Sequence, residues 1–391
     1  MAENILTLSE ILKKMNKDQT HEVAKFGVED LTKFGTLSLG SPGLDFCIYN
    51  SFPERKITEI CGGEGSGKTT LAYLICGSFQ KKQRKINPGK ERKILWVDLE
   101  CTADPSWASK MGYDMNASDV QTIGYRPEDA TAEEIFDWIK AIVKTGEVGL
   151  VVIDSLSMLV SQQVLDESFE KKDMGGIAKV LGDFVKKMAS LLIKYDCTLI
   201  GLNQLRDNLT GYGNPLITSG GRGWKHACSL RLMLRRGEFF DENYVTAKST
   251  AESPAGYVME CAVLKSKVCK WDRKLGKTYV NYDRGIDILQ DTVETAIHFK
   301  IIDASGAWFS LLDPDTGEIM LDAEGKPIKL NGKKKVRDYL EEHKDVWNKV
   351  YNKVYEKLSQ KDDPNIVSFE KMLGMNVAET FGVDFTKVDD E

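Results

Sequence analysis

Apolar residues in this chain alternate between short continuous runs and helical spacings. Four runs of aliphatic and β-branched residues are typical of strands buried on both faces: 56–61, 93–99, 149–153 and 197–202. Between them, apolar residues three and four positions apart predict helices at 69–79, 132–143 and 177–193. Strands that alternate with helices form βαβ units, so the pattern predicts an α/β fold: a mostly parallel central sheet flanked by helices.

The pattern changes twice beyond this region. Runs at 229–235, 258–265 and 277–282 lack long helices between them, which predicts antiparallel strands at the sheet edge. DPDTGEIMLDAEGKPIKLNG predicts turns and a polar hairpin, and 333–358 carries one apolar stripe, which predicts a single helix. The opposite face of that helix is basic: Lys333, Lys334, Lys335, Arg337 and Lys349. We therefore expect a small α+β C-terminal domain that ends in an acidic tail, VDDE.

The amino-terminal segment predicts a short helical arm. Its apolar residues recur at helical spacing: Ile5, Leu8, Leu12 and Met15. Thr7 and Glu10 have the spacing of a capping box. Such a helix packs on its own core or docks on a neighbouring subunit. We divide the chain into a docking arm at 1–35, a core at 36–310 and a C-terminal domain at 311–391.

Composition narrows the class of protein. The chain has 391 residues, 42% of them hydrophobic, as in ordinary globular proteins. No apolar run approaches a membrane span, no signal peptide is evident, and the eight cysteines show no CxxC pair. These features predict a cytoplasmic protein without a membrane partner. The net charge of −6 by itself favours a protein that does not bind DNA, so any DNA contact must come from local loops.

A phosphate-binding loop is the strongest local signal. In ITEICGGEGSGKTTLAYLI, the motif G-x-x-x-x-G-K-[ST] follows a predicted strand and precedes a predicted helix. Its glycines let backbone amides point at a polyphosphate, and the helix amino terminus adds positive potential. We expect Lys68 to neutralise the β- and γ-phosphates of ATP and Thr69 to bind Mg²⁺. The expected nucleotide-binding residues are Gly62, Gly63, Glu64, Gly65, Ser66, Gly67, Lys68, Thr69 and Thr70.

Two other predicted strands end in carboxylates. GLVVIDSL places Asp154 at the carboxyl end of a strand, where ligands bind in such sheets, and we expect it beside the Mg²⁺ ion. KILWVDLE ends in Asp98 and Glu100, and either carboxylate could polarise the water that attacks the γ-phosphate. The residues alone do not choose between these two.

Several motifs, in this order, resemble the bacterial RecA recombinase family, of which the chain would be a divergent member. They run from about residue 37 to 309: SLGSPGLD, GGEGSGKTT, VDLECTADPSWA, VVIDS, GLNQLR, GNPLITSGGRGWKHACSLRLMLRR, LKSK and GAWFS. The long block and LKSK are the most specific. The resemblance implies a RecA-like P-loop NTPase core.

The resemblance implies roles around the nucleotide. Glu100 matches the glutamate that activates water, and Gln204 matches the glutamine that senses the γ-phosphate. Trp107 matches an aromatic residue that stacks on adenine, and Asp104 stands where the adenine edge is recognised.

The resemblance also implies residues that act between subunits. Lys265 and Lys267 resemble lysines that reach the nucleotide of the next subunit, and Tyr282 resembles an aromatic residue that covers its adenine. Lys225 and Arg231 resemble subunit-contact residues. Such a head-to-tail interface builds an open helical filament when its rotation does not close.

Two segments resemble the family's DNA loops. The main one is RDNLTGYGNPLITSGGRG, at 206–223, which is polar, glycine-rich and long for a connection. Its expected DNA contacts are Arg206, Tyr212, Gly213, Ile217, Thr218, Ser219, Gly220, Gly221 and Arg222. The other lies near 165–176, with Lys171, Lys172, Met174, Gly175 and Gly176 as expected contacts.

The resemblance implies an ATP- and Mg²⁺-dependent DNA recombinase. It would form filaments on single-stranded DNA, exchange strands with a homologous duplex and hydrolyse ATP in a DNA-dependent manner, in recombination and repair. Two alternatives are a hexameric ring helicase of the same fold and an ATP-gated DNA-binding scaffold without strand exchange. A ring motor would lack the paired lysines and GNPLITSGG, and the intact Glu100 and Gln204 weigh against a scaffold.

Overall fold

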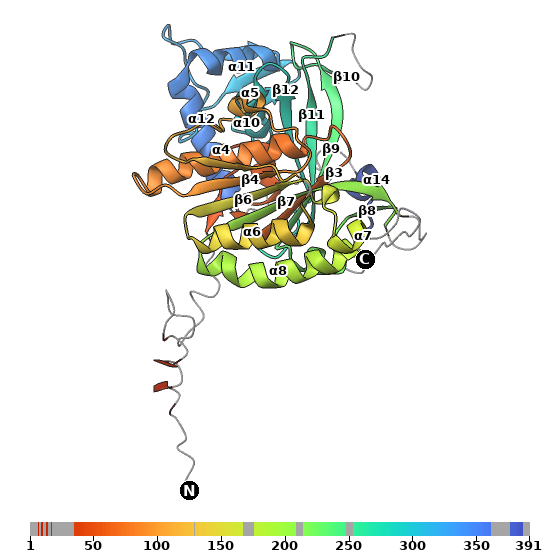
Figure 1. Ribbon diagram of the computed structural model, residues 1–391. Helices are drawn as coiled ribbons and strands as arrows, with labels where there is room; N and C mark the ends of the chain where they lie inside the picture. Colours follow the sequence, from red (N-terminus) through yellow and green to blue (C-terminus); the bar gives the residue numbers. More distant parts are fainter. Residues whose placement is uncertain are drawn as a thin grey trace.

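The computed structural model describes residues 35–128, 130–166, 176–208, 214–247, 253–360 and 376–385, with positions 7, 9–10, 13–14 and 17 near the start. Its central strands are β3 (Ile57–Gly62), β4 (Lys93–Asp98), β5 (Thr122–Tyr125), β6 (Val148–Asp154), β7 (Thr198–Asp207), β9 (Leu230–Phe240), β11 (Gly256–Ser266), β12 (Leu275–Asn281) and β13 (Gly285–Ile286). They lie in one 11-stranded sheet in the order β13-β12-β11-β9-β3-β7-β6-β4-β5 (Figure 1). The short strands β8 (Leu216–Thr218) and β10 (Thr246–Ala247) pair with β7 and β9.

Strand pairing confirms the predicted mostly parallel sheet. Every neighbouring pair from β9 through β3, β7, β6 and β4 to β5 is parallel. β11 and β12 add antiparallel strands, as expected. β9 pairs antiparallel with β11, also as expected, but it lies inside the sheet because its other edge pairs in parallel with β3. The register places Gly62 opposite Gln204 and Asp98 opposite Asp154. The carboxyl ends of four parallel strands therefore meet at one edge.

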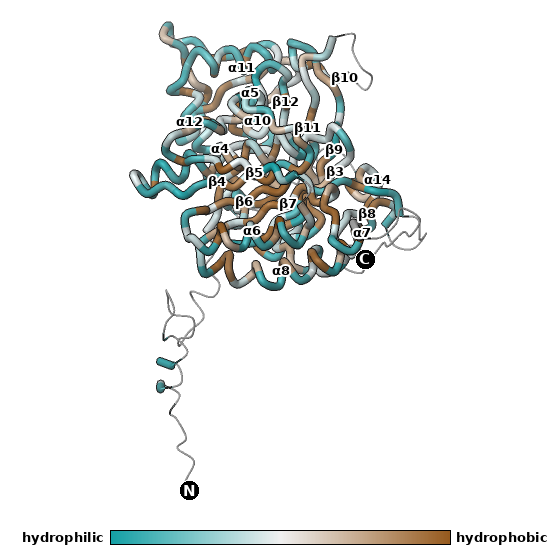
Figure 2. Tube along the Cα trace, viewed as in Figure 1, coloured by the Kyte–Doolittle hydropathy of each residue, from teal (hydrophilic) through white to brown (hydrophobic). Residues whose placement is uncertain are grey.

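Helices cover both faces of the sheet (Figure 1). α4 (Lys68–Ile86) lies on one face, and α6 (Ala132–Lys144) and α8 (Gly176–Lys194) lie on the other. Alternate strand residues divide between two cores: Trp96 packs in the cluster that contains α4, and Val97 in the cluster that contains α6 and α8. Figure 2 shows the resulting hydrophobic strands between more polar helices. The shorter connecting elements are β1 (Thr36–Leu37), α3 (Pro42–Cys47), β2 (Phe52–Pro53), η1 (Leu156–Met158) and α7 (Gln162–Asp166).

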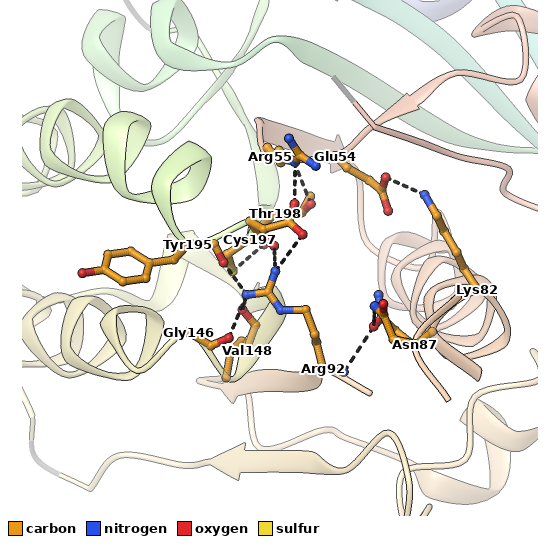
Figure 3. Close-up of polar contacts among 12 residues, drawn as sticks. Glu54, Arg55, Lys82, Asn87, Arg92, Gly146, Val148, Tyr195, Cys197 and Thr198 are labelled. Carbon is orange, nitrogen blue, oxygen red and sulfur yellow. Dashed lines mark hydrogen bonds and ion pairs between the residues drawn. The ribbon is translucent and has the colours of Figure 1, made fainter. Parts of the chain in front are cut away.

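The amino-terminal edge of the sheet is held together by Arg92, just before β4 (Figure 3). Its guanidinium donates to the carbonyls of Gly146 (3.0 Å), Val148 (3.1 Å) and Tyr195. Gly146 precedes β6, Val148 is its first residue, and Tyr195 lies in the turn before β7, so one side chain joins the starts of three strands. These contacts stabilise the amino-terminal edge of the sheet, and the candidate site lies at the opposite edge, where the parallel strands end.

The C-terminal part is a small α+β unit. The strands β14 (Ile302–Ser305), β15 (Trp308–Leu311) and β16 (Lys329–Asn331) form an antiparallel sheet. It packs with α10 (Ile288–His298), α11 (Lys333–Glu342) and α12 (Lys344–Ser359) around a third core, which also includes Met233 and Leu264 of the central sheet. The predicted domain boundary at residue 311 falls inside this sheet, so we propose a boundary before β14.

Two predictions about the C-terminal helix were wrong. The single helix expected at 333–358 is two helices, because the chain leaves helical geometry at His343 (φ −109°, ψ 78°). Arg337, expected on an exposed basic face, is buried and pairs with Asp287 (3.2 Å) and Glu341 (2.8 Å). Pattern alone did not show the acidic partners that draw this arginine inward.

Near the amino terminus, Thr7 and Glu10 form the predicted capping box: the Thr7 amide donates to Glu10 Oε2 (2.8 Å), and the Glu10 amide donates to Thr7 Oγ1 (3.3 Å). The rest of the predicted arm and the acidic tail at 386–391 lie outside the described residues. Within the described ranges, no helix has both the length and the apolar character to span a membrane.

Candidate nucleotide site and DNA-facing hairpin

The phosphate loop connects the end of β3 directly to the first residue of α4, Lys68. Gly67, the residue before that helix, has a φ of 94°, which favours glycine. A Cβ on Gly67 would lie 2.5 Å from Met259 Cε and 3.0 Å from the Tyr257 hydroxyl. A Cβ on Gly62 would lie 2.6 Å from the Leu234 carbonyl oxygen. Backbone conformation and close packing against β9 and β11 therefore both require glycine, and the loop amides sit at a helix amino terminus.

The first two residues of α4, Lys68 and Thr69, make the polar contacts of the loop with its own carbonyls and with Asp154. Lys68 Nζ donates to the carbonyls of Gly62 (3.2 Å) and Gly63 (2.9 Å), and burial lowers the pKa of its ammonium. Thr69 Oγ1 donates to Asp154 Oδ2 (2.9 Å). Asp154 is buried at the end of β6, and burial raises the pKa of its carboxyl to about 6. A hydroxyl and one carboxylate fit Mg²⁺, which is usually held by one or two carboxylates together with substrate phosphates.

The structure separates the two carboxylates that follow β4, beginning with Asp98. Asp98 is buried, and its oxygens accept hydrogen bonds from the amides of Thr102 (3.1 Å) and Ala103 (3.3 Å). Arg126 also pairs with it at 2.6 Å. A carboxylate that already accepts three donors is poorly placed to take a proton from water, so Asp98 organises the turn.

Glu100 lies instead between Asp154, at the end of β6, and Gln204, the predicted γ-phosphate sensor. Its amide donates to the Asp154 carbonyl (3.2 Å), which holds it beside the end of β6. Its Oε1 accepts hydrogen bonds from Gln204 Nε2 (3.0 Å) and from Ser155 Oγ. Glu100 is only half-buried, and Gln204 is exposed. The geometry therefore favours Glu100 over Asp98 as the water-activating group.

The expected adenine-binding residues lie around a short helix, α5 (Pro105–Lys110). Asp104 caps this helix by accepting from the Trp107 amide (3.0 Å), and Trp107 Nε1 donates to Thr70 Oγ1 (3.0 Å). Lys110 Nζ lies 5.2 Å from the Trp107 ring centroid and donates to the Tyr282 carbonyl (3.1 Å). Lys110 thus contacts both the Trp107 ring and the Tyr282 backbone of the same chain, and the role of Tyr282 at the neighbouring subunit's adenine stays a prediction.

The paired lysines contact the helix that follows the predicted DNA loop, α9 (Gly221–Ala227). Lys265 Nζ donates to the Lys225 carbonyl (3.1 Å), and Lys267 Nζ donates to the His226 carbonyl (2.8 Å). Cations are favoured at such a helix carboxyl terminus. Arg231, expected at a subunit contact, is buried and paired with Glu59 instead, because a fully buried carboxylate needs a cation.

The described part of the predicted main DNA loop, 206–208 and 214–223, contains a short antiparallel strand pair, called the DNA hairpin below, and then enters a helix. β7 continues to Asp207 and pairs with β8, and Gly220 (φ 100°) is the residue before α9. Arg206 and Arg222 are exposed, whereas Thr218 and Gly220 are buried, so contact between DNA and these two would require the hairpin to move. Several expected contacts lie outside the described residues: Lys171, Lys172, Met174, Gly175, Tyr212 and Gly213.

A C-terminal segment packs on this hairpin, which the sequence did not indicate. It contains α14 (Val377–Phe381) and continues to residue 385. Asn214 of the hairpin donates from Nδ2 to the Asp384 carbonyl (3.4 Å) and accepts from the Asp384 amide. Val383 and Ile217 line the same small cavity. The hairpin is therefore partly covered by residues distant in the sequence.

Arg236, in the middle of β9, was not expected at the site. A Cβ on Gly65 would lie 3.4 Å from Arg236 Nη1, which places this guanidinium beside the phosphate loop. In the sequence, Arg236 stands only as the second arginine of LMLRR, which gives no sign of its position beside the loop. Arg236 lies beside the phosphate loop because β9 pairs with β3, the strand that leads into this loop.

The fold and these groups define a P-loop ATPase whose site lies at the carboxyl edge of a mostly parallel sheet. A family model described as RecA N-terminal domain matches residues 5–287. The chain is 31% identical over 311 residues to Protein RecA of Chlorobaculum parvum, covering 78% of this chain and 83% of that one. It is 28% identical over 353 residues to Protein RecA of Mycoplasma mobile, covering 88% and 96%. The chain therefore belongs to the RecA family, which binds ATP and DNA and acts in recombination and repair.

Proposed function

We propose that this chain forms ATP-dependent filaments on single-stranded DNA and exchanges strands with a homologous duplex in the cytoplasm, hydrolysing ATP as DNA is bound. One observation carries the proposal. Gln204 donates to Glu100 in the nucleotide site and belongs to β7, the strand whose end forms the predicted DNA hairpin. A change at the γ-phosphate would therefore act directly on a strand of the DNA-facing element.

Within the nucleotide site, each residue has a separate task. Thr69 and Asp154 would hold Mg²⁺, which when bound supplies positive charge to offset the charge of the phosphates. Lys68 would exchange its two carbonyl contacts for phosphate oxygens. Glu100 would accept a proton from the attacking water, and the hydrogen bond from Gln204 holds its carboxylate in place.

The interface proposal rests on Lys265 and Lys267. Both ammonium groups contact the carboxyl terminus of α9, and Lys267 is exposed. We propose that they reach the nucleotide of the next subunit in a head-to-tail filament. ATP bound to one subunit would then change the contacts of these lysines with α9, the helix behind the DNA hairpin of the neighbouring subunit. Trp107 would stack on the adenine of its own chain, and Tyr282 would cover the adenine bound to the next subunit.

The Lys68→Ala variant tests the nucleotide site, with Lys81→Ala as a control on the exposed side of the same helix. We expect Lys68→Ala to abolish nucleotide-dependent binding to single-stranded DNA and ATP hydrolysis, while the control behaves as wild type. Undiminished ATPase activity in Lys68→Ala would refute the assignment of this site.

Strand exchange is tested with homologous and heterologous duplexes in the presence of ATP. We expect joint products with the homologous duplex alone. Products with neither duplex, together with closed hexamers in electron micrographs, would indicate a ring motor. ATP-dependent filaments that yield no products would indicate a scaffold.

A further inference from the structure

A buried ion pair lies beneath the phosphate loop. Glu59, on the strand β3 that leads into this loop, is fully buried and accepts a hydrogen bond from Arg231 Nε of β9. The other carboxylate oxygen accepts from Asn203 Nδ2 of β7 (2.9 Å) and from Trp224 Nε1 of α9 (3.0 Å). Arg231, Asn203 and Trp224 are also buried. One carboxylate therefore joins three strands of the sheet to the helix behind the DNA hairpin.

The charge of Glu59 makes these contacts strong. Burial by itself raises the pKa of the Glu59 carboxyl, but the Arg231 charge and the hydrogen bonds bring this pKa below its ordinary value. The group is thus ionised at neutral pH. Hydrogen bonds to an ionised group are about twice as strong as those between neutral groups, and a buried charge that loses a donor is costly. The position of Glu59 therefore constrains the positions of Asn203 and Trp224.

The elements that Glu59 joins are those that must communicate in the proposed function. Asn203 directly precedes Gln204 and also donates to the Ser219 carbonyl (2.9 Å), between β8 and α9. In the described part of the chain, three buried atoms here have no hydrogen-bond partner: Asn203 Oδ1, Thr218 Oγ1 and Ser219 Oγ. Buried polar atoms are normally paired, so the base of the hairpin holds donors and acceptors that a second arrangement could use.

We propose that Glu59 is a positioning residue that couples the nucleotide site to the DNA hairpin. A shift of β7 at Gln204 moves Asn203, and the shared carboxylate passes that shift to Trp224 and hence to α9 and the hairpin. This inference rests on the proposed function, because it explains how ATP would change the affinity for DNA. It adds a second connection, through the strand beneath the phosphate loop, to the direct one through β7.

The Trp224→Phe variant removes the Nε1 donor to Glu59 and keeps an aromatic ring. Trp96→Phe is the matched control: Trp96 is equally buried, and within the described residues its Nε1 has no partner, so the same atoms are deleted without loss of a hydrogen bond. The affinity for fluorescent single-stranded DNA is measured by anisotropy with and without a non-hydrolysable ATP analogue. The affinity for the analogue alone is measured separately.

We expect Trp224→Phe to reduce the analogue-induced gain in DNA affinity by roughly tenfold, the effect of losing one hydrogen bond to a charged group. Affinity for the analogue alone should stay within about twofold, since Trp224 does not line the phosphate loop. Trp96→Phe should keep the full gain. An unchanged gain in Trp224→Phe, or an equal loss in both variants, would overturn the inference.

A second measurement covers the case in which Trp224→Phe does not fold. Hydrogen exchange of wild-type peptides that span 214–228 is followed with and without the analogue. Slower exchange around Trp224 on nucleotide binding supports the coupling, and unchanged exchange overturns it. If wild-type protein shows no analogue-induced gain in DNA affinity, the proposed function fails instead, and the two failures are thereby distinguished.

Discussion

Replacing Glu100 with glutamine examines the catalytic assignment with little disturbance of the structure. The amide has nearly the size of the carboxylate, and its oxygen can still accept the hydrogen bonds from Gln204 Nε2, now 3.0 Å from Oε1, and from Ser155 Oγ. The negative charge and the capacity to take a proton from water are lost. A general base contributes roughly 10²–10⁴-fold to rate, which is about 3–5 kcal/mol in the activation barrier.

We therefore expect DNA-dependent phosphate release by Glu100→Gln to fall by roughly 10²–10⁴-fold at saturating ATP. ATP-dependent binding to single-stranded DNA should persist, because Lys68, Thr69 and Gln204 are intact. Complexes with DNA should also live longer, since the step that releases the γ-phosphate is slowed.

Asp98→Asn is the control for this experiment. Its carboxylate accepts two backbone amides and pairs with Arg126, so the variant should lower the melting temperature while hydrolysis stays within about tenfold of wild type. The reasoning is refuted if Glu100→Gln hydrolyses ATP within about tenfold of wild type while Asp98→Asn loses about a hundredfold.

Two further predictions concern the interface and the effect of pH. Lys267→Ala should leave the affinity for ATP within about threefold of wild type in dilute protein. It should lower DNA-dependent ATPase activity at least about tenfold, because the proposed contact between its ammonium group and the neighbouring subunit's phosphates is lost. An equal loss of ATP affinity and of ATPase activity would place Lys267 in its own chain's site. Burial raises the pKa of Asp291 to about 7, so the folded chain retains a proton that the unfolded chain loses near pH ~4. The stability this group contributes is therefore present below pH ~4 and lost as pH rises towards 7. Melting curves of wild type and Asp291→Asn should show the stability of the wild type falling relative to the variant between about pH 4 and about pH 7 and levelling off above that range. A pH-independent difference would contradict this account.

Local patterns predicted much of the fold and of the nucleotide site. The strands, the helices and the phosphate loop depend on residues that are close together in the chain, so their spacing is informative. The single helix predicted at 333–358 shows the limit of such reasoning. The apolar stripe of this segment is continuous, yet the segment forms two helices that meet at His343. Hydrophobic spacing reports which face is buried and does not report whether the helix axis continues.

The sequence by itself determined that the chain builds a parallel sheet around a phosphate loop, because strand period, helix period and glycine spacing are local properties. Only the tertiary structure distinguished Asp98 from Glu100, since the two carboxylates differ in the partners that other strands and turns bring to them. It also decided that Arg231 is an interior residue, because its partner Glu59 is 172 positions away in the chain. Burial and charge pairing are properties of three-dimensional neighbours, and a linear pattern does not contain them.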